Sequence, residues 1–282
     1  MLHIATVHWL DDRWVDIQLK YFNHCISIPF KVYAFTSGLS ENHRAKYFYS
    51  SSEMIVLHPV KLNILADLVM MNSNDPNDLL MFIDGDAFPI GDIVTYANQK
   101  LKDYPLVAIQ RKENVGDIQP HPSFCLTTVQ LWKSIRGDWK KGHRWINAKG
   151  KSVTDVGGNL LGALEENQIK WYPMLRSNRR NLHPLWFGVY DDIVYHHGAG
   201  FRSPVSRFDI SKFSKMRRFY QKTYKKLPAP IQNAVPPDWR PLAKAGRINE
   251  VLCRQVFDMI RSDFHFHRYF TQESAPSGDA ST

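Results

Sequence analysis

The stretch LLMFIDGDAFP, residues 79–89, decides the fold class of this chain. Its first five residues are apolar and predict a buried strand, because a strand covered on both faces reads as a continuous apolar run. The strand stops at Asp84, and Asp86 follows after Gly85. Ligands of open α/β sheets bind beyond the carboxyl ends of the strands, so these two carboxylates mark a candidate site.

The spacing of the two aspartates favours a metal site. Residues two apart in an extended segment point to the same side, so Asp84 and Asp86 can offer hard oxygen ligands to one Mn²⁺ or Mg²⁺ ion. Gly85 between them allows close approach of the backbone to a ligand. Such a cation would offset the charge of a diphosphate. The alternative is an acidic turn, since Asp-x-Asp tripeptides are common.

Around this stretch, short apolar runs alternate with helix-like segments, as in βα units arranged about a mostly parallel sheet. The pattern predicts strands at 3–9, 30–35, 53–59, 79–84, 105–110, 169–174 and 192–197. It predicts helices at 12–25, 61–73, 155–167 and 248–262, and a strand leading into a helix at 123–135. The fold class is therefore α/β.

The composition is that of a globular protein. The chain has 282 residues, of which 44% are hydrophobic and 22% charged, which excludes a disordered or fibrous protein. Its three cysteines (Cys25, Cys125 and Cys253) form no Cys-x-x-Cys pair and predict neither disulfides nor a zinc cluster. We find no signal peptide and no apolar run of about 18 residues, so we expect a cytoplasmic protein.

The net charge of +9 is concentrated near the C-terminus. Between Arg202 and Lys226, nine basic residues stand against a single acid, Asp209. Apolar residues recur among them at helical spacing and predict an amphipathic basic helix at 210–227. Three interpretations stay open: contact with an anionic membrane surface at the inner face of the cell membrane, binding of acidic acceptors or nucleic acid, or a solvated helix face.

A second motif stands later in the chain, in the run HHGAGFR at 196–202. With this run, with the Asp-x-Asp motif and with Lys61 and Asp67 in the preceding helix, residues 1–205 resemble GT-A glycosyltransferases. The resemblance implies a GT-A-like, mixed and mostly parallel sheet flanked by helices. Residues 206–270 would then form a basic helical C-terminal extension, and 271–282 a disordered tail.

The same resemblance implies a function. The chain would move a sugar from a nucleotide diphosphate sugar, a UDP-sugar, to a hydroxyl of a saccharide or glycolipid, in cell-surface polysaccharide or lipopolysaccharide synthesis. Asp84 would lie near the ribose and the metal, Asp86 would be the principal metal ligand, and His197 the third. His196 is the alternative third ligand, because adjacent strand residues point to opposite faces and only one can reach the metal.

The nucleotide sugar would contact residues from several segments. By the resemblance, Thr6, Val7 and His8 line the base pocket, and Lys61 and Asp67 hold the nucleotide or the sugar. The alternative for this last pair is a solvated helix face. Further contacts are implied for Gly85, Gly200 and Arg202, the last of these with the diphosphate.

Asp155 is the candidate catalytic residue on the acceptor side. It resembles the acid that accepts the proton of the acceptor hydroxyl in inverting members of the family, where a neutral hydroxyl is a poor nucleophile. The alternative is a helix N-cap, a position that aspartate favours. If configuration is retained, no dedicated base is needed.

Two other function classes remain as alternatives. A phosphohydrolase of the haloacid dehalogenase type also ends a buried strand with Asp-x-Asp and could recruit Asp191 and Asp192 as late metal ligands, although its nucleophile usually lies on the first strand. A non-catalytic protein could bind nucleotides or nucleic acid. We expect no nucleic-acid partner, because the first 201 residues are nearly neutral and offer no extended basic face.

Overall fold

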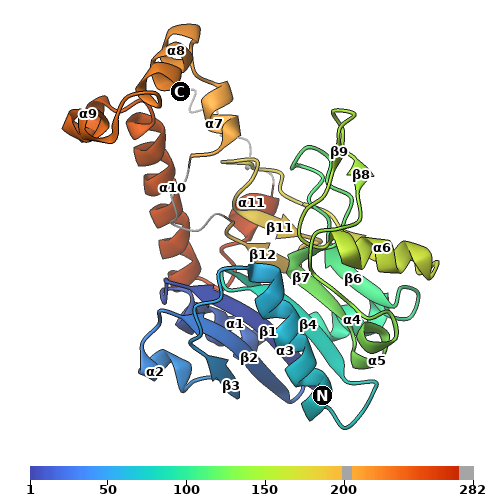
Figure 1. The fold of residues 1–282 in the computed structure, drawn as a ribbon. Helices are drawn as coiled ribbons and strands as arrows, with labels where there is room; N and C mark the ends of the chain where they lie inside the picture. The colour runs from blue at the N-terminus through green and yellow to red at the C-terminus, as the bar shows by residue number, and fades with distance from the viewer. Residues whose placement is uncertain (199–204, 273–282) are drawn as a thin grey trace, which may run out of the picture. The chain divides into compact units, whose positions relative to one another are not determined.

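The computed structural model describes residues 1–198 and 205–272 (Figure 1). The chain forms two compact units. The first, here called the sheet unit, comprises residues 1–198 together with the chain from Phe264 onward. The second, the helical unit, ends at Asp263. The predicted tail lies outside the described residues from 273 on.

A seven-stranded sheet forms the centre of the sheet unit as far as the chain is described, in the order β10-β6-β7-β4-β1-β2-β3. Its strands are β1 (Leu2–Trp9), β2 (Phe30–Ser37), β3 (Tyr49–Ser51), β4 (Leu79–Asp84), β6 (Leu106–Ile109), β7 (His121–Thr128) and β10 (Tyr172–Met174). β7 runs antiparallel to both of its neighbours, and the other pairings are parallel. The predicted mixed, mostly parallel sheet flanked by helices is confirmed.

Helices cover both faces of this sheet. They are α1 (Val15–Cys25), α3 (His58–Asn72), α4 (Ile93–Lys100), α5 (Val129–Ser134) and α6 (Gly158–Glu166). The sheet unit also contains two short helices, α2 (Glu41–Arg44) and α11 (Arg268–Thr271). Alternate residues of a strand face opposite sides. In β4, Met81 and Ile83 therefore pack in one core with residues of α1 and α4, whereas Leu80 and Phe82 pack in the other with α3, α5 and α6.

Two small antiparallel sheets complete the sheet unit. One consists of β11 (Gly188–Tyr190), β12 (Val194–His196) and β5 (Ala87–Pro89), in that order. The other pairs β8 (Trp145–Ile146) with β9 (Ser152–Val153). These strands are two or three residues long and leave little alternation in the sequence, and the pattern predicts only β12 among them.

The strand predicted at 53–59 is wrong. The edge strand is β3, and the apolar run after it is exposed, with Val56 at 77% and Leu57 at 62% of their full accessibility. His58 and Pro59 instead open α3, since proline suits the first turn of a helix. This shift moves His58 from a predicted strand to a helix start.

The helical unit contains α7 (Arg207–Ser211), α8 (Lys215–Tyr224), α9 (Ala229–Ala234), a short 3₁₀ turn (Pro237–Trp239) and α10 (Ala243–Ser262). The single basic helix predicted at 210–227 is therefore divided. Ser214 causes the division, because its hydroxyl accepts a hydrogen bond from the Arg217 amide and caps α8. In the described part of the chain, no helix has the length and apolar character needed to cross a bilayer.

Candidate metal centre

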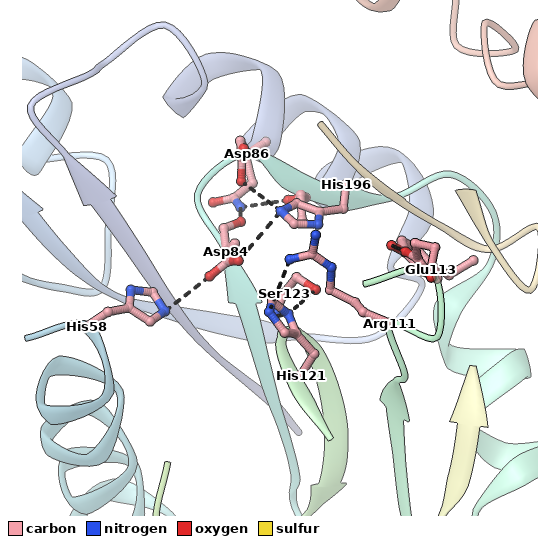
Figure 2. A network of polar contacts seen from close by, with 11 residues as sticks. His58, Asp84, Asp86, Arg111, Glu113, His121, Ser123 and His196 are labelled. Atoms are coloured by element: carbon pink, nitrogen blue, oxygen red, sulfur yellow. Dashed lines mark hydrogen bonds and ion pairs between the residues drawn. The ribbon is translucent and has the colours of Figure 1, made fainter. Parts of the chain in front are cut away.

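Three side chains from two sheets meet beyond the end of β4. Asp84 ends β4, Asp86 precedes β5, and His196 ends β12, which pairs with β5 so that His196 lies opposite Ala87. Their ligand atoms all lie within 4.8 Å of one another. The Nε2 atom of His196 is 3.4 Å from Asp86 Oδ1 and 3.6 Å from Asp84 Oδ2 (Figure 2). This arrangement brings together the two aspartates that the sequence singles out.

The third member of this group is His196 and not His197, which the resemblance favoured. The imidazole of His197 turns to the opposite side, where Nδ1 is 3.0 Å from the Tyr195 hydroxyl and the ring centroid is 4.7 Å from that of Trp14. Complete burial lowers the pKa of His197 to about 3. The alternation of side chains along a strand explains why only one histidine reaches the carboxylates.

A buried glutamine fixes the turn that carries the aspartates. Gln18 of α1 donates from Nε2 to the carbonyl oxygens of Asp84 and Ala87, each at 2.8 Å. Its Oε1 lies 3.2 Å from both the Thr6 hydroxyl and His8 Nε2. Sequence analysis missed Gln18, although a polar residue one helical turn before Phe22 on the buried face of a predicted helix is a usable signal.

The C-terminal end of β1 packs against the turn formed by Asp84, Gly85 and Asp86. Thr6 and His8 are buried against Gln18, and burial lowers the pKa of His8 to about 4. A Cβ on Gly85 would lie 2.6 Å from the Val7 carbonyl oxygen and 2.7 Å from His8 Nδ1, so only glycine fits there. The expected role of these residues in a base pocket stays a prediction.

The first turn of α3 also reaches the site. His58 Nε2 is 3.2 Å from Asp84 Oδ1, a contact that sequence analysis missed because it placed His58 in a strand. Lys61, one turn later, is buried with its ammonium 4.2 Å from the ring centroid of Trp9. Asp67 is exposed and lies nine residues beyond His58, about 13 Å further along the helix. The expected role of Asp67 in binding the nucleotide or the sugar stays a prediction.

Both carboxyl groups carry their negative charge at neutral pH. Partial burial raises the pKa of Asp84, but the contacts with His58 and His196 outweigh it and hold the pKa below its ordinary value. The pKa of Asp86 is lowered in the same way, with His196 outweighing the effect of burial. Two carboxylates and an imidazole form a donor set that suits Mn²⁺ or Mg²⁺. The residues present therefore fit the expected cation.

Polar residues from β6 and β7 flank this group (Figure 2). Arg111 follows β6, and its Nη1 lies 3.5 Å from Nε2 of His121, the first residue of β7. The rings of His121 and His196 are 6.3 Å apart. His121 belongs to a Pro-His-Pro run next to the predicted strand. The local sequence pattern does not indicate that His121 lies near Arg111, because the two residues come together only through the pairing of β6 with β7.

Asp155 is not the N-cap of α6. Gly157 holds that position in a left-handed conformation with φ of +88°, and the exposed Asp155 carboxylate lies 3.1 Å from Lys141 Nζ. A Cβ on Gly157 would be 2.2 Å from the carbonyl oxygen of Pro120, so the turn lies against the residue before His121. The catalytic role of Asp155 stays a prediction.

Gly200 and Arg202 lie outside the described residues. Asp191, the late ligand of the phosphohydrolase alternative, is held elsewhere. Its carboxylate accepts hydrogen bonds from the Tyr96 hydroxyl at 2.8 Å and from the Leu175 amide at 3.2 Å. It is not part of the group formed by Asp84, Asp86 and His196. Nothing in this geometry favours that alternative.

Comparison with known proteins gives matches among solved structures. No protein-family model and no curated protein matches the sequence. GlyE, a glycosyltransferase of Streptococcus pneumoniae, aligns over 47% of this chain and 35% of its own, with 11% identity and a TM-score of 0.36. The galactosyltransferase LgtC, in complex with donor and acceptor sugar analogues, aligns over 58% and 70%, with 11% identity and a TM-score of 0.34.

TarS of S. aureus aligns over 92% of this chain and 55% of its own, with 10% identity and a TM-score of 0.40. A structure of TarS residues 1–349 contains UDP-GlcNAc. The region of GlyE that aligns with this chain is about a third of the length of GlyE. These identities and TM-scores are low, so we take the function from this chain's own residues.

Proposed function

We propose that this chain is a metal-dependent glycosyltransferase that moves a sugar from a nucleotide diphosphate sugar, a UDP-sugar, to a hydroxyl of a saccharide or glycolipid acceptor. One observation carries the proposal: Asp84, Asp86 and His196 converge at the carboxyl end of a central strand. In α/β sheets this is where ligands bind. A divalent cation bound there would supply positive charge beside the leaving diphosphate.

Hydrogen bonds and packing within the chain preorganise this centre in the absence of a ligand. Gln18 donates hydrogen bonds to the backbone carbonyls of Asp84 and Ala87, which flank the turn. His58 contacts Oδ1 of Asp84, and His196 faces Oδ2 of the same carboxylate. Gly85 lets the turn rest on the end of β1. A site whose groups need no rearrangement stabilises developing charge more effectively than a mobile one.

Asp155 is our proposed general base for the acceptor hydroxyl. Its support is positional: the turn that carries it rests on Pro120, and His121 next to Pro120 lies beside His196. The carboxylate is exposed, so an acceptor can reach it. A base at this point would take the proton as the hydroxyl attacks the anomeric carbon.

We further propose that the enzyme acts in cell-surface polysaccharide synthesis at the inner face of the cell membrane. In α8, the apolar side chains of Met216 and Phe219 are exposed, at 81% and 71%, beside lysines and arginines. A basic helix with exposed apolar residues suits an anionic lipid surface. The buried thiols of Cys25 and Cys125 suit a reducing compartment.

The test is binding of nucleotides with and without metal. Thermal-shift and calorimetric titrations with UDP, GDP, CMP, dTDP and their sugar conjugates, each with and without Mn²⁺, should show a metal-dependent gain in stability with one nucleotide. Asp86→Asn should weaken this binding by about 100-fold or more, because the substitution removes a charged ligand.

Asp103→Asn is the matched control, since it removes the same charge from an exposed position in the turn after α4. Its nucleotide binding should equal that of the parent protein. Unchanged binding in Asp86→Asn would refute the metal centre. A folded parent protein that binds none of the nucleotides would refute the transferase.

A further inference from the structure

A stretch rich in aromatic residues returns to the sheet unit after α10. Residues 264–270, with the sequence FHFHRYF, follow the end of the helical unit and include the start of α11 (Figure 1). We call them the aromatic segment. Phe266 and Phe270 are buried, at 3% and 0% of their full accessibility. The residues that bury them belong to the small sheet that carries His196.

The aromatic segment covers one face of that small sheet. The ring centroid of Phe266 is 4.8 Å from that of Tyr195 in β12 and 6.2 Å from that of Phe88 in β5. The ring centroid of Phe270 is 6.3 Å from that of Tyr195. The Phe270 carbonyl also accepts hydrogen bonds of 2.8 and 3.0 Å from the amides of residues 179–180. Ring packing and main-chain hydrogen bonds therefore join this segment to the sheet unit.

The other face of the small sheet carries the metal centre. Adjacent residues of a strand point to opposite sides, so Tyr195 faces the aromatic segment while His196 faces the carboxylates. Asp86 precedes β5, and its backbone carbonyl accepts a hydrogen bond of 3.0 Å from the His197 amide. Asp84 instead ends β4 of the large sheet. The separation of His196 from Asp84 therefore depends on where the small sheet lies against β4.

Hydrogen bonding alone gives so small a sheet little stability. Its three strands have three residues each, and sheets of this size need packing on an apolar face to be stable. Tyr21 of α1 contributes to that packing, since its ring stacks on Phe88 with the centroids 4.3 Å apart. The aromatic segment packs on β12 itself, the strand that carries His196.

We propose that the aromatic segment is a positioning element of the metal centre, with Phe266 as the residue that contacts both β5 and β12. By packing behind β12, it holds the imidazole of His196 within reach of both carboxylates. This inference rests on the proposed function for the bound ion, whereas the position of β12 can be measured without an ion. Residues 264–270 thus belong to the working site, although they lie on the face of the small sheet away from the carboxylates.

The first test compares cation binding with stability. Phe266→Leu should weaken Mn²⁺ binding by the full chain about tenfold, because outer partners of metal ligands have effects of this size. It should also lower the melting temperature by several degrees. Calorimetric titration at a temperature where every variant is folded measures the affinity. An affinity equal to that of the parent protein would overturn the proposal.

Phe22→Leu is the matched control, since Phe22 is equally buried and its ring is lost in the same way. Phe22 packs on Phe30, which pairs with Leu2 at the end of β1 remote from the metal centre. This variant should lower the melting temperature to a similar extent and keep Mn²⁺ affinity within about twofold. An equal loss of Mn²⁺ affinity in both variants would mean general loosening and would also refute positioning by the aromatic segment.

The second test needs no metal and reports on β12 directly. The His197 amide donates to the Asp86 carbonyl, so its hydrogen exchange is slow only while β12 lies against the turn. Phe266→Leu should accelerate exchange of this amide at least tenfold more than exchange of the Met81 amide in the middle of β4. Phe22→Leu should accelerate both amides by the same factor. If Phe266→Leu does not fold, Phe266→Met keeps the apolar bulk without the ring and replaces it. Equal acceleration of both amides in the Phe266 variant would contradict the proposal.

Failure of the proposed function gives a different result. In that case the parent protein binds neither Mn²⁺ nor a nucleotide, while the exchange rates still report on the contact between the aromatic segment and β12.

Discussion

At the end of β12, two adjacent histidines have opposite surroundings. His196 is directed at two carboxylates, whereas His197 is enclosed by Trp14 and the Tyr195 hydroxyl. The first environment suits a metal ligand and the second a core residue. Substitutions at the two positions should therefore have separable effects.

His196→Gln should lower Mn²⁺ affinity by about tenfold or more with little change in melting temperature, because an amide is a poorer ligand than imidazole. His197→Gln should keep Mn²⁺ affinity and lower the melting temperature by several degrees, because its ring packing is lost. Calorimetric Mn²⁺ titration and thermal melting measure both. Loss of Mn²⁺ binding in His197→Gln with affinity retained in His196→Gln would reverse this assignment.

At this scale, sequence predicts the residues whose signal is local. Asp84 and Asp86 stand two apart at the end of an apolar strand, so one window contains the evidence. His58, His121 and Arg111 come from separate segments, and only the register of the sheet and the start of α3 bring them to the site. Such meetings depend on tertiary packing and leave no local pattern.

Among the elements, α3 and α6 are joined by one aspartate. Asp138 accepts from Asn63 of α3 at 2.6 Å, from Asn159 of α6 at 2.7 Å, and from the Lys140 amide at 2.9 Å. The Trp139 amide in turn donates to Asn63. This network holds the two helices over the same face of the sheet.

Asp138→Asn should cost about 1–3 kcal/mol of unfolding free energy at pH 7, because an amide cannot accept from all three donors. Burial alone would raise the pKa of Asp138, but the hydrogen bonds outweigh it and lower the pKa below its ordinary value. The carboxylate contributes fully above the unfolded pKa of about 3.9 and loses its contribution as pH falls through the lower folded value.

Urea unfolding at several pH values measures this effect. The deficit of Asp138→Asn should be constant near neutrality and should shrink below about pH 4. A deficit independent of pH in that range would mean that the charge of Asp138 is not the cause.

Elements with a strong apolar signal are predictable from sequence. The strand at 79–84, a continuous apolar run, has the same bounds in the structure, and α10 lies where apolar residues recur at helical spacing. β5 and β11 have three residues each and owe their form to pairing with β12. The run at 53–59 is largely apolar but pairs with no strand, so its hydrophobicity alone leads to the wrong prediction of a strand.

On the scale of the whole molecule, charge divides the chain. The sequence places the excess of basic residues after residue 201, and the helical unit begins near this point. What the sequence does not give is the break at Ser214, which depends on one cap.

Replacing Lys222, Lys225 and Lys226 together by Gln should weaken binding of the full chain to vesicles that contain phosphatidylglycerol. Each basic residue near such a surface contributes about 1 kcal/mol, so three should amount to a loss of about 100-fold. Vesicle co-sedimentation at low and high salt measures it, since salt should weaken binding of the parent protein.

The matched control replaces three exposed lysines of the sheet unit, Lys102, Lys133 and Lys149. It removes the same net charge and should bind vesicles as the parent protein does. Equal losses in the two triple variants would show attraction by overall charge and not by the lysines at the C-terminal end of α8.

The pairing of β12 with β5 also sets the order in which the centre can form. During synthesis Asp84 and Asp86 emerge from the ribosome long before His196, so a nascent chain holds the carboxylates without their third partner. Closing so long a loop is slow compared with local folding. We therefore expect tight binding of the cation only after the domain has folded. The metal ion would then stabilise the folded state without directing the folding pathway.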